Sequence, residues 1–236
     1  MGRLNALPLL ALLSACAPLQ ATAPVLPYPG GFAEGGWVTG RFFVALPGAP
    51  LLLDADQPSL YAAYPYQLLI YRDGYWQSLP LPGIPRFLRA SSGKVVVGLG
   101  EGVYTEEGFL PYPARDAAWS QEGLFWVGEK GLYREATLLR PGAFSQVVAL
   151  DTGVVALGQE AYFYPEGLLL LPLPHVVRKA QPGACGVVAL MEGWVYLVRP
   201  EGAKPVAEAQ DFAAWGETLY LTPGRRVVSC KEVVWP

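Results

Sequence analysis

Side chains that commonly carry catalysis or bind metals are scarce in this sequence. Its 236 residues include one histidine, His175, and three cysteines. Nucleophilic catalysis and zinc binding need such residues beside a suitable partner, and the sequence has no HxH, HExxH, GxSxG or phosphate-loop pattern. We therefore expect no catalytic residue, no metal and no cofactor, and we interpret His175 as a residue at the end of a strand.

Acidic side chains recur at regular intervals in the middle of the chain, at Glu101, Glu129, Glu160 and Glu192. Each occupies the same turn of an internal repeat, so the four would form a sparse acidic ring on one face of the molecule. Such residues often keep a surface solvated and protect the edges of strands. The other interpretation is an interaction face for a basic partner or a cation.

Aromatic residues are concentrated between positions 61 and 76. Tyr64 and Tyr66 flank Pro65 at a predicted turn, so we expect these two side chains to be exposed. Tyrosine offers an apolar ring with a polar tip, which suits a platform for a sugar or a peptide. The alternative is that the aromatic residues pack between neighbouring sheets.

The composition excludes several classes of protein. With 52% hydrophobic and 16% charged residues the chain is not intrinsically disordered, and a net charge of -3 gives no basic surface for nucleic acid. The 27 glycines and 23 prolines favour short strands joined by turns over long helices. No Asn follows Asn5 and only two Met occur, which fits a thermophilic source.

The N-terminus predicts export. Residues 1–15 contain Arg3, an apolar run and small residues before Cys16, which is the pattern of a signal peptide. The apolar run is too short to span a bilayer. Residues 16–34 are rich in proline and alanine, and we interpret them as a tether before a folded domain at 35–236.

Leu13-Ser14-Ala15-Cys16 resembles the lipobox of bacterial lipoproteins. The resemblance implies cleavage after Ala15 and acylation of Cys16, for example with palmitate, at the new N-terminus. Two or three acyl chains anchor a protein stably to a membrane. A lipid bilayer is therefore one expected partner, and the expected location is the extracytoplasmic cell envelope, on either the inner or the outer membrane.

The body of the chain repeats at a period of about 31 residues. Residues 95–108 align without gaps on residues 154–167, and residues 187–196 fit the start of the same pattern. A Tyr, Phe or Val marks each of six copies, at Tyr71, Tyr104, Tyr133, Phe163, Tyr196 and Val228.

Each copy contains four strand-like pieces, which in the second copy cover residues 86–90, 94–98, 102–105 and 109–112. The fourth piece of nearly every copy ends in proline, which is typical of an edge strand. The architecture resembles a β-propeller, although no WD or kelch signature occurs. We predict an all-β propeller of six four-stranded blades, or of seven if residues 32–49 form a partial blade that the C-terminus completes.

The two remaining cysteines are predicted to lie on one face of neighbouring blades. Cys185 is in the turn between the first and second strands of the fifth copy, and Cys230 follows the third strand of the sixth. In an oxidising envelope this pair is a candidate disulfide. The alternative is that both are small residues buried in different cores.

The leading functional hypothesis is a monomeric, membrane-anchored lipoprotein that acts as a non-catalytic binding or scaffold module for an envelope protein or polymer. One alternative is an extracytoplasmic hydrolase or dehydrogenase with a site at the propeller channel. Another is a glycan or cell-wall binding module. Three or more polar side chains converging at the channel mouth would favour the enzyme, whereas an apolar or plugged channel would favour the scaffold.

Overall fold

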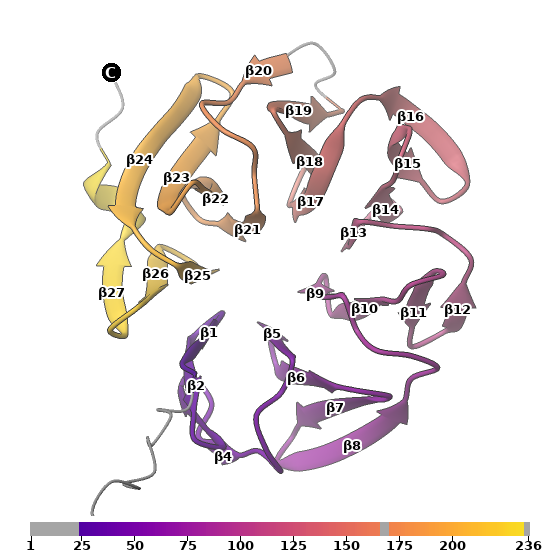
Figure 1. The fold of residues 1–236 in the computed structure, drawn as a ribbon, viewed down its shortest axis with the longest axis vertical. Helices are drawn as coiled ribbons and strands as arrows, with labels where there is room; N and C mark the ends of the chain where they lie inside the picture. The colour runs from indigo at the N-terminus through magenta and orange to yellow at the C-terminus, as the bar shows by residue number, and fades with distance from the viewer. Residues whose placement is uncertain (1–23, 166–169, 234–236) are drawn as a thin grey trace, which may run out of the picture.

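The chain folds into seven β-sheets arranged as blades around a central axis (Figure 1). The computed structural model describes residues 24–165 and 170–233. Within these residues six blades have four antiparallel strands and the last has three. The described helical structure is a single 3-10 turn, η1 (Cys230–Glu232), and no described helix has the length and hydropathy needed to cross a membrane.

The first four blades follow one another along the chain. Blade 1 consists of β1 (Leu26–Tyr28), β2 (Gly31–Glu34), β3 (Trp37–Gly40) and β4 (Val44–Ala45). Blade 2 consists of β5 (Leu52–Asp56), β6 (Ser59–Tyr64), β7 (Gln67–Arg72) and β8 (Tyr75–Pro80). Blade 3 consists of β9 (Phe87–Ser91), β10 (Lys94–Gly98), β11 (Val103–Thr105) and β12 (Gly108–Leu110). Blade 4 consists of β13 (Asp116–Ser120), β14 (Gly123–Val127), β15 (Gly131–Arg134) and β16 (Thr137–Pro141).

The remaining three blades complete the ring. Blade 5 consists of β17 (Phe144–Leu150), β18 (Gly153–Gly158), β19 (Glu160–Tyr164) and β20 (Leu170–Pro172). Blade 6 consists of β21 (Lys179–Gly183), β22 (Gly186–Met191), β23 (Trp194–Arg199) and β24 (Gly202–Glu208). Blade 7 consists of β25 (Asp211–Trp215), β26 (Thr218–Thr222) and β27 (Arg226–Ser229).

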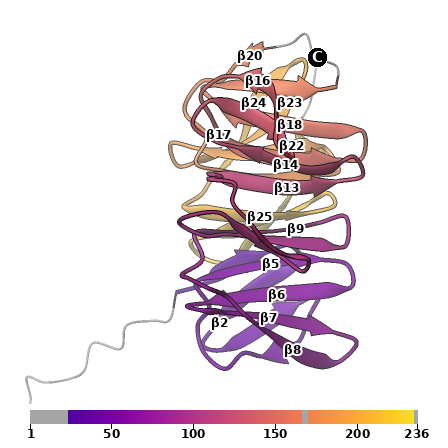
Figure 2. The same ribbon diagram turned by 90° about the vertical axis from the view of Figure 1, so that its right-hand side faces the viewer.

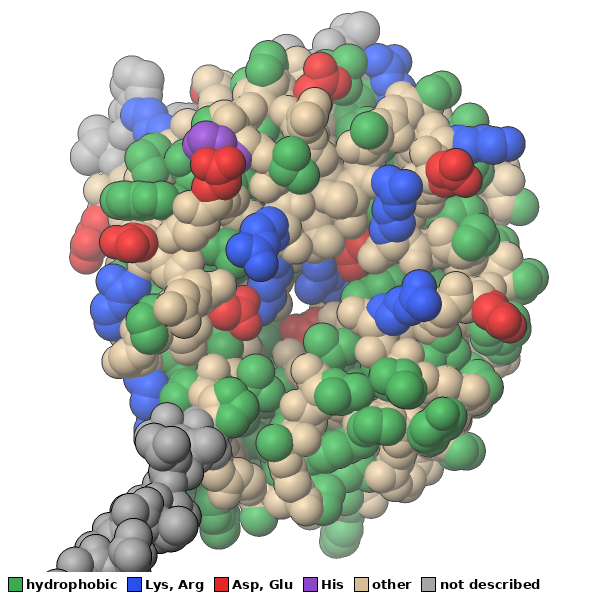
Figure 3. All heavy atoms as spheres, in the orientation of Figure 1, with side chains coloured by type: hydrophobic (Ala, Val, Ile, Leu, Met, Phe, Trp, Pro, Cys, Tyr) green, Lys and Arg blue, Asp and Glu red, His purple; other side chains and the backbone are tan. Residues whose placement is uncertain are grey.

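Strand order follows chain order in every blade, and the first strand lies nearest the axis (Figure 1). Figure 2 shows the disc from its edge, with the strands crossing its thickness. Because each blade is an up-and-down sheet, the turns joining second to third strands share one face with the connections between blades. We call this the front face, which is turned towards the viewer in Figures 1 and 3, and the opposite one the back face.

Consecutive residues of the inner strands are buried because neighbouring blades cover both sides of each sheet. Val95, Val96 and Val97 of β10 have no more than 1% of their surface exposed. Val95 and Val97 pack with blade 2, whereas Val96 packs with blade 4. The β-branched run in the sequence is thus explained by two separate cores, one on each side of the blade.

The ring has seven blades, which is the larger of the two numbers that the sequence allowed. The additional blade is blade 1, at the N-terminal end. It is not a partial blade at residues 32–49 that the C-terminus completes. Residues 26–45 form all four strands of blade 1, and the C-terminal blade stays three-stranded within the described residues.

The propeller also begins earlier than residue 35. Leu26–Tyr28 pairs with Gly31–Ala33 through a tight turn in which Gly30 has φ of +111°, and Tyr28 is completely buried. The predicted tether at residues 16–34 therefore overlaps the first two strands. Its prolines suggested an extended linker, but a proline is compatible with the short edge strand that forms here.

Blade 7 closes onto blade 1 through side chains. Arg225 pairs with Glu34 at 3.1 Å and donates a hydrogen bond to Thr39 at 2.9 Å. On the back face the guanidinium of Arg41 lies 3.8 Å from the ring centre of Trp215. These contacts join the two ends of the propeller, and no strand is exchanged between blades 1 and 7 in the part of the chain that the structure describes.

Candidate functional site

Polar side chains from the innermost strands meet along the central channel. They are Asp54 of β5, Arg89 of β9, Asp116 of β13, Gln146 of β17, Lys179 of β21 and Asp211 of β25. Figure 3 shows basic and acidic side chains around and inside a hollow at the centre of the front face. The charges of Asp54, Asp116 and Asp211 all act on Arg89, which places these groups in one electrostatic environment.

Arg89, Asp116 and Gln146 form a network that spans three blades. The Arg89 guanidinium donates to both carboxylate oxygens of Asp116, at 3.0 and 3.1 Å, and to Gln146 Oε1 at 2.6 Å. Asp116 also accepts a hydrogen bond from the backbone N–H of Val147 at 3.0 Å. Asp116 is fully buried. Burial raises the pKa of Asp116, and the neighbouring Arg89 charge opposes that shift.

Asp54 of blade 2 is buried in the channel beside the blade that carries Arg89. Its carboxylate accepts hydrogen bonds from the backbone N–H groups of Ala55 at 3.0 Å and Ala90 at 2.8 Å. Burial raises the pKa of Asp54 to about 6, although the charge of Arg89 and the two amide bonds favour the ionised form. This carboxyl group therefore titrates well above the ordinary range of an aspartate.

Lys179 of blade 6 and Asp211 of blade 7 form a second ion pair along the channel. Lys179 Nζ lies 2.7 Å from Asp211 Oδ1, and both side chains keep part of their surface exposed. Burial lowers the pKa of Lys179, and the adjacent Asp211 carboxylate opposes that shift. Because water still reaches this pair, it is screened more than the Arg89–Asp116 pair.

Side chains of the innermost strands repeatedly accept a backbone N–H from the next blade. Asp54 accepts from Ala90, Asp116 from Val147, Gln146 from Ala180 and Gln181 from Ala214, at 2.8 to 3.3 Å. Ser91 Oγ accepts from Trp119 N and donates to Trp119 O. The inner edge of each blade has no strand partner, so these bonds satisfy amides that would otherwise be buried without an acceptor.

These hydrogen bonds cross five consecutive junctions between blades, from β5 of blade 2 to β25 of blade 7. Among the residues that the structure describes, no side chain makes such a bond between β1 and either neighbouring inner strand. Blade 1 is therefore held by apolar packing and by its contacts with Arg225 and Trp215. The other blades are also joined by these hydrogen bonds between inner strands near the axis.

The four predicted acidic residues lie in successive blades on the front face. Glu101, Glu129, Glu160 and Glu192 are exposed, between the second and third strands or at the start of the third. The structure does not bring them into contact with one another. Glu192 lies 3.1 Å from Nδ1 of His175, which is in the connection between blades 5 and 6. Within the described ranges no group of three or more His, Cys, Asp or Glu could hold a metal ion.

Tyr64 and Tyr66 do not form a shared exposed platform. Tyr64 packs against the core between blades 1 and 2, and its hydroxyl donates to the carbonyl of Gly48 at 3.0 Å. Tyr66 is 61% exposed, with a φ of +62° in the turn before β7. The expected exposure therefore holds for Tyr66 and is wrong for Tyr64, which fills the space beside the loop of blade 1.

Cys185 and Cys230 are joined by a disulfide, with their Cα atoms 6.1 Å apart. The bond connects the first turn of blade 6 to the 3-10 turn after β27. Both residues are buried and pack in the core between blades 6 and 7. Cys16 lies outside the described residues, as do the rest of the predicted signal peptide and lipobox.

Sequence reasoning missed the channel network. A signal was present, since the first strand-like piece of most copies contains a charged residue among apolar ones, at Asp54, Arg89, Asp116, Lys179 and Asp211. Nothing in the local pattern indicates that these residues meet. Their proximity depends on the closure of the ring.

No protein-family model and no curated protein matches the sequence. Several solved structures share its fold. The match to PorZ, an essential surface component of the type-IX secretion system of Porphyromonas gingivalis, has 12% identity and a TM-score of 0.50, and covers 74% of this chain and 32% of that one. This chain thus spans about a third of the length of PorZ.

Two further matches cover most of both chains. BBS1N, solved in complex with ARL6DN, has 16% identity and a TM-score of 0.53, with coverage of 84% of this chain and 82% of that one. The WD40 domain of Neurospora crassa Pan2 has 10% identity and a TM-score of 0.52, with 85% of each chain covered. At such low identities the similarity establishes the β-propeller fold alone.

Proposed function

We propose that this protein is a monomeric, lipid-anchored module of the cell envelope that binds or scaffolds a protein or polymer partner and carries out no catalysis. The observation that carries this proposal is that the buried carboxylates of the channel bind backbone amides of the protein itself. The buried acceptors Asp54 and Asp116 are bonded to backbone amides of the next blade, so their chemistry supports the ring.

A ring whose inner strands are joined by these hydrogen bonds is a rigid support for exposed loops. Its front face presents the turns that carry Glu101, Glu129, Glu160 and Glu192, spread over four blades. Loops on a rigid scaffold commonly provide binding surfaces, and a partner with basic groups would complement these side chains. The similarity to other propellers supports this role only through the shared fold.

The membrane anchor in this proposal rests on the sequence Leu13-Ser14-Ala15-Cys16. Cys16→Ala, expressed as the full precursor in a diderm bacterium, tests it by cell fractionation. We expect the variant to leave the membrane fraction, while a Gln20→Ala control outside the lipobox remains there. Retention of Cys16→Ala in the membrane fraction would show that the lipobox interpretation is wrong.

The binding role is tested with a photo-crosslinking amino acid at Glu160, in cells of the organism that makes the protein. The exposed back-face residue Gln121 is the matched control position. We expect adducts of higher mass from Glu160 and none from Gln121. Equal adducts from both positions, or none from either, would argue against the front face as a binding surface.

An extracytoplasmic hydrolase or dehydrogenase is the second candidate function. It is favoured by one observation: polar residues do converge in the channel, and they include a carboxyl group with a raised pKa and an amine with a lowered pKa. Such shifts are frequent at active sites. Turnover of a compound from a metabolite mixture by the intact protein, lost in Lys179→Ala, would support this candidate.

A further inference from the structure

An uncharged surface covers part of the front face of blades 1 and 2, beside the exposed ion pair of Glu34 and Arg225 at the remaining front turn of blade 1. It is formed by three connections, residues 46–51, 65–66 and 80–85, which we call the apolar face. Its exposed side chains are all apolar or aromatic: Pro47, Ala49, Leu51, Pro65, Tyr66, Pro80, Pro82 and Ile84. The residues Leu51, Tyr66 and Ile84 are 46%, 61% and 55% exposed.

Hydrogen bonds hold the three connections together as one surface. Tyr66 N donates to Gly83 O at 3.2 Å, and Leu81 N donates to Tyr66 O at 2.9 Å. The Tyr64 hydroxyl links the same turn to Gly48 at 3.0 Å. The apolar side chains are therefore presented by a fixed surface, and they have no partner within the described part of the molecule that would bury them.

The charge distribution separates this sector from the rest of the front face. Residues 46–51, 65–66 and 80–85 contain no Asp, Glu, Lys, Arg or His. In Figure 3 the lower part of the molecule, where blades 1 and 2 lie, is green and tan where grey atoms do not cover it, whereas red and blue side chains are frequent over the other blades. Contiguous exposed apolar surface of this kind marks a site of association with a protein or a membrane.

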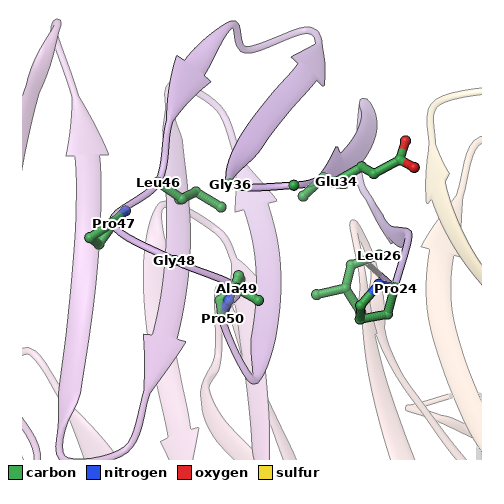
Figure 4. A pocket seen from close by; sticks show the side chains of 11 residues that line it. Pro24, Leu26, Glu34, Gly36, Leu46, Pro47, Gly48, Ala49 and Pro50 are labelled. Carbon is green, nitrogen blue, oxygen red and sulfur yellow. The ribbon is translucent and has the colours of Figure 1, made fainter. Parts of the chain in front are cut away.

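The N-terminal end of the described chain lies at the edge of this same surface. Pro24 is exposed and, with Leu26, Glu34, Gly36 and the loop from Leu46 to Pro50, lines a pocket of about 390 Å³ (Figure 4). Glu34 is the charged residue of this lining, and it is paired with Arg225. Seven residues separate Cys16 from Pro24. Even a fully extended chain spans only about 3.6 Å per residue, so Pro24 lies within about 29 Å of an acylated Cys16.

We propose that the apolar face lies against the lipid bilayer that holds the acyl chains of Cys16. This inference rests on the proposed lipid anchor, and it adds which surface of the propeller meets the membrane. The short link starts at the apolar face, so this sector is the part of the disc kept nearest the lipid. Since the face has no charge to desolvate, its proline, leucine and isoleucine side chains can enter the interfacial region, and Tyr66 suits the headgroup level.

Site-specific fluorescence on the lipidated full-length protein tests this arrangement. The probe is an NBD dye on a single introduced cysteine, which is the free thiol when Cys16 is acylated and Cys185 and Cys230 are bonded. Ile84→Cys and Leu51→Cys report on the apolar face. Glu129→Cys is the control on the charged part of the front face, and Gln121→Cys is the control on the back face.

The labelled proteins are floated with phosphatidylcholine vesicles with and without doxyl-labelled phosphatidylcholine. We expect doxyl quenching at positions 84 and 51 to exceed quenching at positions 129 and 121 at least about two-fold, because only the apolar face is in contact with lipid. Iodide in the aqueous phase should show the opposite order.

The flotation and quenching results separate a wrong docking surface from a missing lipid anchor. If the protein floats with the vesicles but all four probes respond alike, the docking proposal is wrong and the lipid anchor stands. If positions 84 and 51 are shielded from iodide and also from doxyl lipid, a second copy or another protein covers the face, which likewise overturns lipid contact. If the acylated protein does not float with vesicles, both proposals are wrong.

Discussion

At the scale of single residues, the most buried charged side chains of the described chain hold neighbouring blades together. Asp116 has no exposed surface, and Arg89 is its partner for two hydrogen bonds. Removing one member of a buried pair leaves the other charge without compensation, which costs far more than breaking an exposed pair. The channel is therefore the place where a single substitution should affect stability most.

Asp116→Ala should destabilise the propeller by about 3–5 kcal/mol, since it strands the Arg89 guanidinium and leaves Val147 N–H without its acceptor. Chemical unfolding followed by tryptophan fluorescence measures the change. Glu122→Ala, which breaks the exposed ion pair with Arg134, is the control and should change stability by less than about 1 kcal/mol. Equal effects of the two substitutions would contradict a structural role for the buried pair.

Asp54 gives the protein a pH dependence of defined sign. Its pKa is raised from 3.8 to about 6 in the folded state, so between these values the folded state holds a proton that the unfolded state has lost. Stability contributed by this group is present at low pH and falls as pH rises from about 4 to about 6, by up to about 3 kcal/mol.

Asp54→Asn keeps an oxygen acceptor for the Ala90 amide and removes the titration. The stability of the natural protein minus that of the variant should therefore decrease between about pH 4 and pH 6 and be level above it. Unfolding curves for both proteins across this range test the expectation. A difference that is constant or increases with pH would show that Asp54 is not the titrating group.

At the scale of elements, each blade gains from contacts outside its own strands. Within the described residues blade 7 has three strands where the other blades have four, and the disulfide joins the 3-10 turn after β27 to the first turn of blade 6. The packing between these blades already buries both cysteines. The disulfide therefore supplements a packed junction and limits how far blade 7 can separate.

Reduction of the disulfide should lower stability without abolishing the fold. The bond spans a sequence separation of 45 residues, for which loop-closure entropy predicts a contribution of about 4 kcal/mol. Unfolding with and without a reductant measures this loss. The Cys185→Ala/Cys230→Ala protein is the control, because its stability should not respond to the reductant.

At the scale of the whole molecule, the described residues close the ring by side-chain contacts, and none of their strands is exchanged between blades 1 and 7. Blade 1 is made entirely from residues 26–45 and blade 7 from the C-terminal residues 211–229. The junctions on either side of blade 1 have no side-chain bond to an inner-strand amide within the described residues. The ring should open most readily there.

Hydrogen exchange should reveal that difference. Amides of blade 1 are expected to exchange faster than the corresponding amides of blades 3 to 6, and Arg225→Ala should accelerate exchange further in blades 1 and 7 by removing the contacts with Glu34 and Thr39. Mass spectrometry of peptides from each blade measures the rates, with Arg134→Ala as a control on an exposed pair of blade 4. Uniform protection around the ring would contradict the expectation.

The sequence by itself determined the blade. Alternating and continuous apolar runs, glycines at turns such as Gly93 with φ of +72°, and prolines after the outer strands are local features, and they sufficed to predict four-stranded units and a propeller. They also sufficed to place Cys185 and Cys230 on one face. Local patterns succeed here because strand pairing within a blade joins neighbours in sequence.

Only the tertiary structure decided the ring and what lies inside it. Whether residues 26–45 form a complete blade, and hence whether there are seven, depends on how the two ends of the chain pack. The meeting of Arg89 with Asp116 and Gln146 depends on the angle between successive blades, and Tyr64 is partly buried because the loop at Gly48 reaches it. Each of these outcomes is set by contacts between residues distant in sequence, which no local pattern encodes.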